Sequence, residues 1–290
     1  MSWGGTKDSR KRGRGILQKL FAVIGDPIAH SMSPSMHNEL FEFYQIDAHY
    51  QPLHVKKADL AAAINGLKAI GISGFNVTIP HKEAIIPFLD RVDSLAAAIG
   101  AVNTVVNENG KLVGYNTDGS GYVKGLMEKI DNDEQVLMIG AGGAARALYF
   151  TIAKLGVKRI DIYNRTKEKA NRILQECPYS VQSKVIDKNE AESSLAEYDM
   201  LIQTTPIGMA PYLTESPLSL HNLQEKTVVS DIIYNPLETR FLNEARQRNA
   251  IIQNGLNMFV YQGALAFEKW TGIFPDTERM KKNVLKQLGG

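Results

Sequence analysis

The chain has 290 residues, of which 44% are hydrophobic and 22% charged, and its formal net charge is +2. This is the composition of an ordinary globular protein, and the length predicts two domains. The sequence contains no apolar run long enough to cross a bilayer and no signal-peptide pattern, so we predict a cytoplasmic protein without a membrane partner. The single cysteine, Cys177, excludes an internal disulfide, and we interpret it as a structural residue.

Basic residues gather at the start of the chain. Residues 1–17 contain five lysines and arginines against one aspartate. Such a cluster can mark contact with nucleic acid, but here it is confined to a polar, glycine-containing segment. We therefore predict a disordered, solvated extension over residues 1–17 and no nucleic-acid partner.

After this extension, short apolar runs alternate with amphipathic stretches. The pattern predicts strands at 21–25, 49–55 and 74–79, helices at 36–44, 58–70 and 94–100, and then a hairpin that turns at 108–110. The Asn-Gly pair in that turn supplies the positive φ that tight turns require. This strand–helix rhythm predicts a mostly parallel sheet with helices on its faces.

A second rhythm of the same kind follows. It predicts strands at 136–139, 159–163, 200–203 and 228–232, helices at 144–155 and 255–270, and a polar helical tail. We predict two α/β domains with a boundary near residue 119. The periodicity alone leaves open which of the two domains the C-terminal helix joins.

A glycine-rich turn, GAGGAAR at residues 140–146, opens this second half. Gly140, Gly142 and Ala145 occupy the three key places of the dinucleotide pattern G-x-G-x-x-G/A. The first permits a tight turn, the second lets the backbone approach a pyrophosphate, and the third allows close packing of helix on strand. A strand precedes the turn and a helix follows it, so we predict a nucleotide site at the start of that helix.

The end of the next strand predicts which nucleotide binds. NAD-binding domains commonly have an acidic residue there, whereas this chain has Asn164, Arg165 and Thr166, with Lys169 close behind. A guanidinium can bind a 2′-phosphate through two hydrogen bonds, which favours NADP. Asp161 lies earlier, inside the strand, and is the weaker candidate. The alternative is that Arg165 is an exposed loop residue.

Polar residues in the first half suggest a substrate site. Ser33 precedes Pro34 and could cap a helix, or Ser31 and Ser33 together could bind a carboxylate. Lys82 follows a strand, and at the start of a helix its pKa would be lowered, which suits proton transfer. Asp118 could likewise be a helix cap or a catalytic partner of Lys82.

Eight motifs occur here in the order seen in shikimate dehydrogenases. They are HSMSP, NVTIPHK, GAVNTV, GYNTDG, GAGGAAR, NRT, DIIYNP and NGLNMFVYQGA, so residues 21–270 resemble that family. The resemblance implies NADP-dependent, reversible reduction of 3-dehydroshikimate to shikimate, on the route to chorismate and the aromatic amino acids. It implies two α/β domains flanking a cleft, the second a Rossmann-like doubly wound parallel sheet. Residues 18–118 plus 251–290 would bind substrate and 119–250 would bind NADP; a homodimer is compatible with this arrangement.

The resemblance also assigns site residues. Lys82 and Asp118 match the catalytic pair, while Ser31, Ser33, Thr78, Asn103, Tyr234 and Gln262 match substrate-binding positions. The cofactor-binding positions are Gly140, Ala141, Gly142, Gly143, Ala144, Asn164, Arg165, Thr166, Lys169, Thr204 and Gly255. Two positions depart from the family pattern: Gln203 begins a run that is more usually Asn-Ala/Thr-Thr, and Asn257 stands where glycine is frequent.

The implied reaction transfers hydride to a carbonyl carbon, and Lys82 would stabilise and protonate the carbonyl oxygen with help from Asp118. No His/Cys cluster of ligand spacing is present, so we expect no metal. Three alternatives remain: an NAD-dependent quinate/shikimate dehydrogenase, a non-catalytic ligand sensor on the same fold, and a folate-linked dehydrogenase. The Asn164-Arg165-Thr166 loop argues against the first, and the Lys82–Asp118 pair argues against the second. The Ser31/Ser33 and NTDG signals argue against the third.

Overall fold

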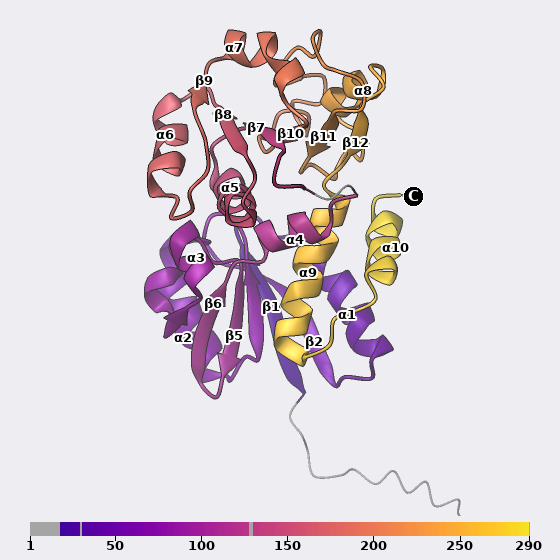
Figure 1. Ribbon diagram of the computed structural model, residues 1–290. Coiled ribbons are helices and arrows are strands. Elements are labelled where there is room, and N and C mark those ends of the chain that lie inside the picture. Colours follow the sequence, from indigo (N-terminus) through magenta and orange to yellow (C-terminus); the bar gives the residue numbers. More distant parts are fainter. Residues whose placement is uncertain (1–17, 30, 128–129, 290) are drawn as a thin grey trace, which may run out of the picture.

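The computed structural model describes residues 18–29, 31–127 and 130–289, which form two six-stranded sheets with helices around and between them (Figure 1). The extension predicted for residues 1–17 lies outside the described residues. Among the helices of the described part, none is long and apolar enough to cross a membrane.

The first sheet is mixed and has the strand order β2-β1-β3-β5-β6-β4. Parallel pairing joins β1 to both β2 and β3, and β5 runs antiparallel to both β3 and β6. The predicted hairpin is confirmed, with Asn109 and Gly110 at φ 54° and 88°. The strands are β1 (Lys19–Gly25), β2 (Ala48–His54), β3 (Gly74–Val77), β4 (Arg91–Val92), β5 (Thr104–Glu108) and β6 (Lys111–Tyr115).

The helices of this half are α1 (Ser33–Phe43), η1 (Lys57–Asp59), α2 (Leu60–Ala69), η2 (Ile86–Phe88) and α3 (Ser94–Ile99). Two local expectations are wrong. Ser33 is already helical, and the residue at the N-cap is Met32, with no side-chain cap bond. Residues 82–85 form turns that lead into η2, so Lys82 does not begin an α-helix, and the helix dipole expected to act on it has no source.

The second sheet is parallel throughout and has the order β12-β11-β10-β7-β8-β9. Chain order reverses between β7 and β10, which is where doubly wound sheets bind ligands beyond the carboxyl ends of their strands. The predicted Rossmann-like sheet is confirmed. Its elements are β7 (Gln135–Ile139), α5 (Gly143–Leu155), β8 (Arg159–Tyr163), α6 (Lys167–Glu176), β9 (Val185–Ile186), α7 (Lys188–Ser193), η3 (Leu195–Glu197), β10 (Met200–Gln203), β11 (Val228–Asp231), α8 (Arg240–Arg246) and β12 (Ile251–Gln253).

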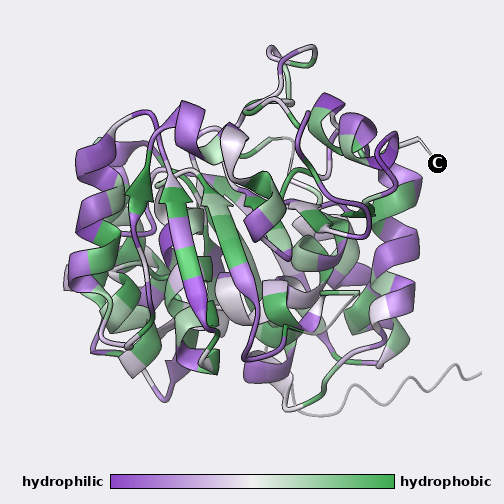
Figure 2. Ribbon diagram, turned by 45° about the horizontal axis from the view of Figure 1, so that its top comes forward, coloured by the Kyte–Doolittle hydropathy of each residue, from purple (hydrophilic) through white to green (hydrophobic). Residues whose placement is uncertain are grey.

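Burial follows from this layering. Strands covered by helices on both faces need apolar side chains on both faces, and Val136, Leu137, Met138 and Ile139 of β7 are at most 1% exposed. Figure 2 shows hydrophobic residues along the strands and hydrophilic ones on the outward sides of the helices.

The C-terminal helices return to the first sheet. α9 (Leu256–Thr271) and α10 (Thr277–Gln287) share an apolar cluster with α1 and β1 that includes Phe21, Phe41 and Phe267. Trp270 of α9 also donates from Nε1 to the carbonyl of Val105 in β5 at 3.0 Å. However, β12 pairs with β11 in the second sheet. The boundary predicted at residue 251 therefore separates β12 from the sheet to which it belongs.

The helix α4 (Asp118–Lys124) lies between α5 and α9, at the junction of the two halves (Figure 1). Glycines on two sides allow this close approach. A Cβ at Gly119 would lie 2.6 Å from the carbonyl oxygen of Ala147 in α5, and one at Gly121 would lie 2.5 Å from the backbone nitrogen of Gln262 in α9. The position of Asp118, the first residue of α4, therefore depends on the absence of side chains at both glycines.

We expect Gly121→Ala to destabilise the protein by about 1–3 kcal/mol, because backbone atoms of α9 cannot make room for a methyl group. Since α4 and α9 also carry the predicted site residues Asp118 and Gln262, the KM for the substrate should rise as well. Urea unfolding and steady-state kinetics measure the two effects. The matched control is Gly66→Ala in α2, where an added Cβ meets nothing within 4 Å and should stabilise by about 0.5–1 kcal/mol. Equal unfolding midpoints for the two variants would contradict the packing argument.

Candidate active site

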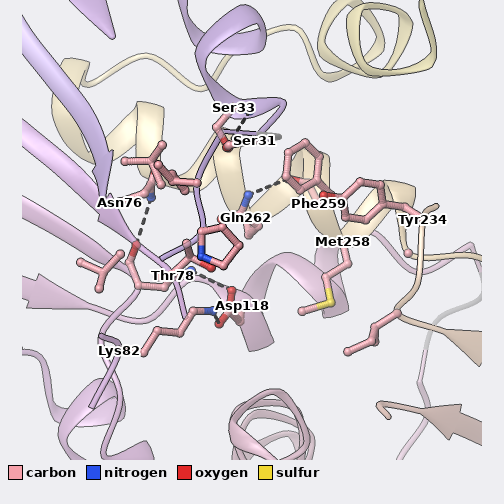
Figure 3. Close-up of a pocket in the computed structure, with 17 residues that line it drawn as sticks. Ser31, Ser33, Asn76, Thr78, Lys82, Asp118, Tyr234, Met258, Phe259 and Gln262 are labelled. Atoms are coloured by element: carbon pink, nitrogen blue, oxygen red, sulfur yellow. Dashed lines mark hydrogen bonds and ion pairs between the residues drawn. The ribbon is translucent and has the colours of Figure 1, made fainter. Parts of the chain in front are cut away.

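A cavity of about 360 Å³ opens beyond the carboxyl ends of β1 and β3. A volume of this size suits a small-molecule ligand. It is lined by every residue predicted to be catalytic or substrate-binding, namely Ser31, Ser33, Thr78, Lys82, Asn103, Asp118, Tyr234 and Gln262. Figure 3 shows Ser31 and Ser33 toward one end of the cavity and Lys82 with Asp118 at the other.

Lys82 and Asp118 form an ion pair in the cavity wall. Lys82 Nζ donates to Asp118 Oδ2 at 2.7 Å, and their side chains are 28% and 10% exposed. The other carboxylate oxygen accepts from Asn103 Nδ2 at 2.8 Å, so both oxygens of Asp118 are held. Asp118 makes these bonds from the first position of α4 and does not cap that helix. The pair thus presents an ammonium group to a ligand next to a carboxylate in a fixed orientation.

A buried hydrogen-bond network that includes Asn76 and Tyr50 holds Asn103 in place. Asn76 Nδ2 donates to the carbonyl of Asn103 at 3.1 Å, and Asn76 Oδ1 accepts from the hydroxyl of Tyr50 at 2.8 Å. Burial raises the pKa of Tyr50 well above its ordinary value, which keeps its hydroxyl a proton donor. Neither Asn76 nor Tyr50 was predicted as a site residue. The only sequence signal for Asn76 was its place at the start of NVTIPHK.

The opposite end of the cavity combines hydroxyl groups with aromatic and amide side chains. Ser31 Oγ accepts from the backbone N–H of Ser33 at 3.4 Å, at the start of α1. Gln262 of α9 donates to the carbonyl of Phe259, and the ring of Phe259 lies 4.7 Å from that of Tyr234. Two neutral hydroxyl groups at the start of a helix can donate hydrogen bonds to a carboxylate, whose charge the helix dipole also stabilises.

The loop that carries Tyr234 is anchored by Asp231, a fully buried residue at the end of β11. Its carboxylate accepts from the backbone N–H of Ile233 at 3.0 Å and from the hydroxyl of Thr239 at 2.8 Å. Burial raises the pKa of Asp231 to about 7. Asp231 was not predicted as a site residue, although it begins the DIIYNP motif.

The glycine turn fits a dinucleotide. Gly140 has φ +114°, and a Cβ there would lie 2.4 Å from Thr204 Oγ1, so only glycine suits this position. Added Cβ atoms at Gly142 and Gly143 would meet nothing within 4 Å. The backbone at the start of α5 is therefore open to a pyrophosphate, which the N–H groups of a helix N-terminus bind well.

The predicted cofactor residues divide between two further cavities on either side of this turn. One, of about 370 Å³, is lined by Ala141, Gly142, Gly143 and Lys169; the other, of about 410 Å³, is lined by Gly140, Asn164 and Arg165. Ala144 lies in the first turn of α5, Thr166 is the N-cap residue of α6, and Thr204 packs against Gly140. Gly255 lies instead in the wall of the substrate cavity.

The weaker candidate for cofactor selection, Asp161, is engaged elsewhere. It is fully buried, forms an ion pair with Arg159 and accepts from the hydroxyl of Tyr198 at 2.7 Å. Arg165, by contrast, is exposed at the rim of the adjacent cavity, where a phosphate could reach it. Within the described ranges, no three His, Cys, Asp or Glu side chains are placed to hold a metal ion.

Three family models and many known proteins are similar to this chain. The family model described as shikimate dehydrogenase substrate binding domain matches residues 23–105, the one described as shikimate / quinate 5-dehydrogenase matches 125–233, and the shikimate 5′-dehydrogenase C-terminal domain matches 255–285. A shikimate dehydrogenase (NADP(+)) from Geobacillus sp. is 60% identical over 277 residues, covering 94% of this chain and 100% of that protein.

Two solved structures are similar over nearly the whole chain. A shikimate dehydrogenase in complex with NADP+ has a TM-score of 0.87 at 42% identity, covering 93% of this chain and 96% of the other. The shikimate 5-dehydrogenase from Listeria monocytogenes, in complex with shikimate and NAD, has a TM-score of 0.88 at 33% identity, with 92% and 96% covered.

Proposed function

The chain belongs to the shikimate dehydrogenase family, and we propose from this premise how its own residues carry out the reaction. The protein is an NADP-dependent oxidoreductase that interconverts 3-dehydroshikimate and shikimate, a step in aromatic amino-acid biosynthesis. The alternative of an NAD-dependent quinate/shikimate dehydrogenase is not favoured by these relatives.

We propose that Ser31 and Ser33 bind the substrate carboxylate and that Lys82 and Asp118 face its reacting oxygen. The observation that carries this assignment is the 2.7 Å ion pair of Lys82 with Asp118 in the wall of a cavity that also contains the two serines. Thr78, Asn103, Tyr234 and Gln262 line the same cavity and would orient the ring hydroxyls.

The chemistry follows from this arrangement. Bound NADPH supplies a hydride. Lys82 stabilises the negative charge that develops on the carbonyl oxygen and gives that oxygen a proton. Asp118 orients the ammonium group and accepts a hydrogen bond from the new hydroxyl. Asn103 donates a hydrogen bond to the carboxylate of Asp118 and so restrains the orientation of the pair.

The residues around the glycine turn would hold the cofactor. The free N–H groups at the start of α5 suit the pyrophosphate, and Arg165 with Lys169 supplies positive charge for a 2′-phosphate. The open backbone at Gly142 and Gly143 supports this fit. Asn164 and Thr166 would position the adenosine end, while Thr204 packs against Gly140 in the turn itself.

An assay with shikimate and quinate side by side, each with NADP and with NAD, tests the function. We expect shikimate-dependent formation of NADPH and a higher kcat/KM for shikimate with NADP than for any other pair. A preference for quinate with NAD would favour the alternative dehydrogenase. Binding of shikimate without turnover of either substrate would favour a ligand sensor.

Four further predictions stay open. We propose a substrate-binding domain made of residues 18–118 with the C-terminal helices and a cofactor domain between them, because α9 and α10 pack against α1 and β1. A homodimer, the absence of a nucleic-acid partner and a cytoplasmic location remain predictions of the sequence. Size-exclusion chromatography with light scattering would test the dimer.

A further inference from the structure

Arg146, the last residue of GAGGAAR, connects the cofactor helix to the substrate half of the molecule. Its Nη2 donates to the carbonyl of Ala98 at 2.9 Å, and its Nε donates to the carbonyl of Ile99. These are the last carbonyls of α3, which ends at Ile99 and is followed by Gly100 in the left-handed conformation. A cation at the carboxyl end of a helix satisfies carbonyls that have no partner within the helix.

The guanidinium group of Arg146 also contacts two residues of the cofactor-binding half. Its central carbon lies 4.5 Å from the ring centroid of Phe150, a fully buried residue of α5. Its Nη1 also pairs with Glu176 at the end of α6. The side chain of Arg146 is only 19% exposed. Arg146 therefore has a defined position relative to α5, from which it donates hydrogen bonds to the end of α3.

The segment after α3 leads directly to the catalytic pair. The backbone N–H of Val102 donates to the backbone carbonyl of Lys82 at 2.8 Å. Asn116 Nδ2 donates to the carbonyl of Ala101 at 3.0 Å, just before Asp118. Asn103, the residue after Val102, donates from Nδ2 to Asp118 Oδ1. A shift at the end of α3 would thus move the supports of both Lys82 and Asp118.

We propose that Arg146 is a positioning residue that joins the first turns of the cofactor helix to the end of α3 and so aligns Lys82 and Asp118 with a bound cofactor. This inference rests on the roles proposed above for those two residues. It goes beyond them, because Arg146 does not line the cavity that contains Lys82 and Asp118. The competing interpretation is that Arg146 binds a cofactor phosphate, since it lines a cavity with Gly142 and Gly143.

Arg146→Met tests the proposal, because methionine keeps a long side chain over Phe150 and removes every donor. We expect kcat to fall about 10- to 100-fold, as misplacement by around an ångström can cost, and the shikimate KM to rise. The Kd of NADPH, measured alone by fluorescence titration, should stay within about twofold of the parent value. Arg146→Lys retains the positive charge and one donor nitrogen and should recover part of the lost kcat.

The matched control is Glu176→Gln, which removes the ion-pair partner of Arg146 but leaves both bonds to α3. Its kcat and KM should lie near the parent values. A Kd for NADPH weakened tenfold or more in Arg146→Met, with kcat intact, would overturn the proposal in favour of phosphate binding. A lower melting temperature with unchanged kinetics would reduce Arg146 to a structural residue.

Two further outcomes keep the test decisive. If Arg146→Met fails to fold, the kcat of Arg146→Lys tests the proposal instead. A kcat equal to that of the parent would overturn the proposal, and a kcat about tenfold lower would support it. A fully active Lys82→Ala enzyme would contradict the proposed catalytic roles, a result independent of the NADPH affinity of the Arg146 variants.

Discussion

Lys82→Ala is expected to lower kcat by roughly two to four orders of magnitude, the usual contribution of a positioned proton-transfer group. The shikimate KM should change much less. Lys82 is paired at 2.7 Å with Asp118 and faces the cavity, so its loss removes both the proton donor and the positive charge beside the reacting oxygen. Steady-state kinetics measure the effect in both directions, with saturating NADP for oxidation and saturating NADPH for reduction. Lys111→Ala, at an exposed position of the β5–β6 hairpin, is the control and should behave as the parent.

Variants of Asp118, Ser31 and Ser33 separate chemistry from binding. Asp118→Ala should also lower kcat, and the double variant should lose less than the sum of both single losses, since the two side chains act on one oxygen. Ser31→Ala and Ser33→Ala should instead raise the shikimate KM first, because the charge of the carboxylate they bind does not change in the reaction. If Lys82→Ala raised KM alone, Lys82 would be a binding residue.

Much of this architecture was readable from the sequence because its signals are local. Bare apolar runs such as residues 136–139 predicted the strands, and the glycine turn predicted where the second sheet begins. The expected helix at Lys82 was wrong for a reason also visible in the sequence. Pro87 would lie inside that helix, without an N–H and in conflict with the carbonyl one turn earlier, and the chain instead forms turns followed by the short η2.

The hydrogen bonds and the ion pair that hold the site residues in place were not predictable in the same way. The bond between Tyr50 and Asn76 joins residues 26 positions apart, and the one between Asn76 and Asn103 joins residues 27 positions apart. The ion pair of Lys82 and Asp118 spans 36 positions. Such contacts depend on which strands become neighbours, and periodicity does not specify this. The resemblance identified the residues that face a substrate, and only the folded chain identified those that hold them in place.

Cofactor choice is expected to depend on Arg165. The side chain lies exposed at the rim of a cavity beside the glycine turn, where it can pair with a 2′-phosphate, while Asp161 is buried and engaged with Arg159. The parent enzyme should prefer NADP over NAD by a factor of ~100 in kcat/KM, or about 3 kcal/mol from charge-assisted hydrogen bonds. Arg165→Ala should remove most of this preference through the KM for NADP, with kcat little changed.

The control for this prediction is Lys158→Ala, which removes an exposed positive charge just before the amino end of the same strand, β8, away from the glycine turn. Its cofactor preference should equal that of the parent, because a charge at the far end of the strand is too distant and too well screened to act on the 2′-phosphate. Equal use of NADP and NAD by the parent would contradict the assignment. A preference for NADP that survives Arg165→Ala unchanged would instead transfer the role to Lys169, which lines the neighbouring cavity from the first turn of α6.

The affinity for NADP should also depend on salt, since an exposed guanidinium–phosphate contact weakens as ionic strength rises. The KM for NADP of the parent should therefore rise with salt more steeply than that of the Arg165→Ala enzyme.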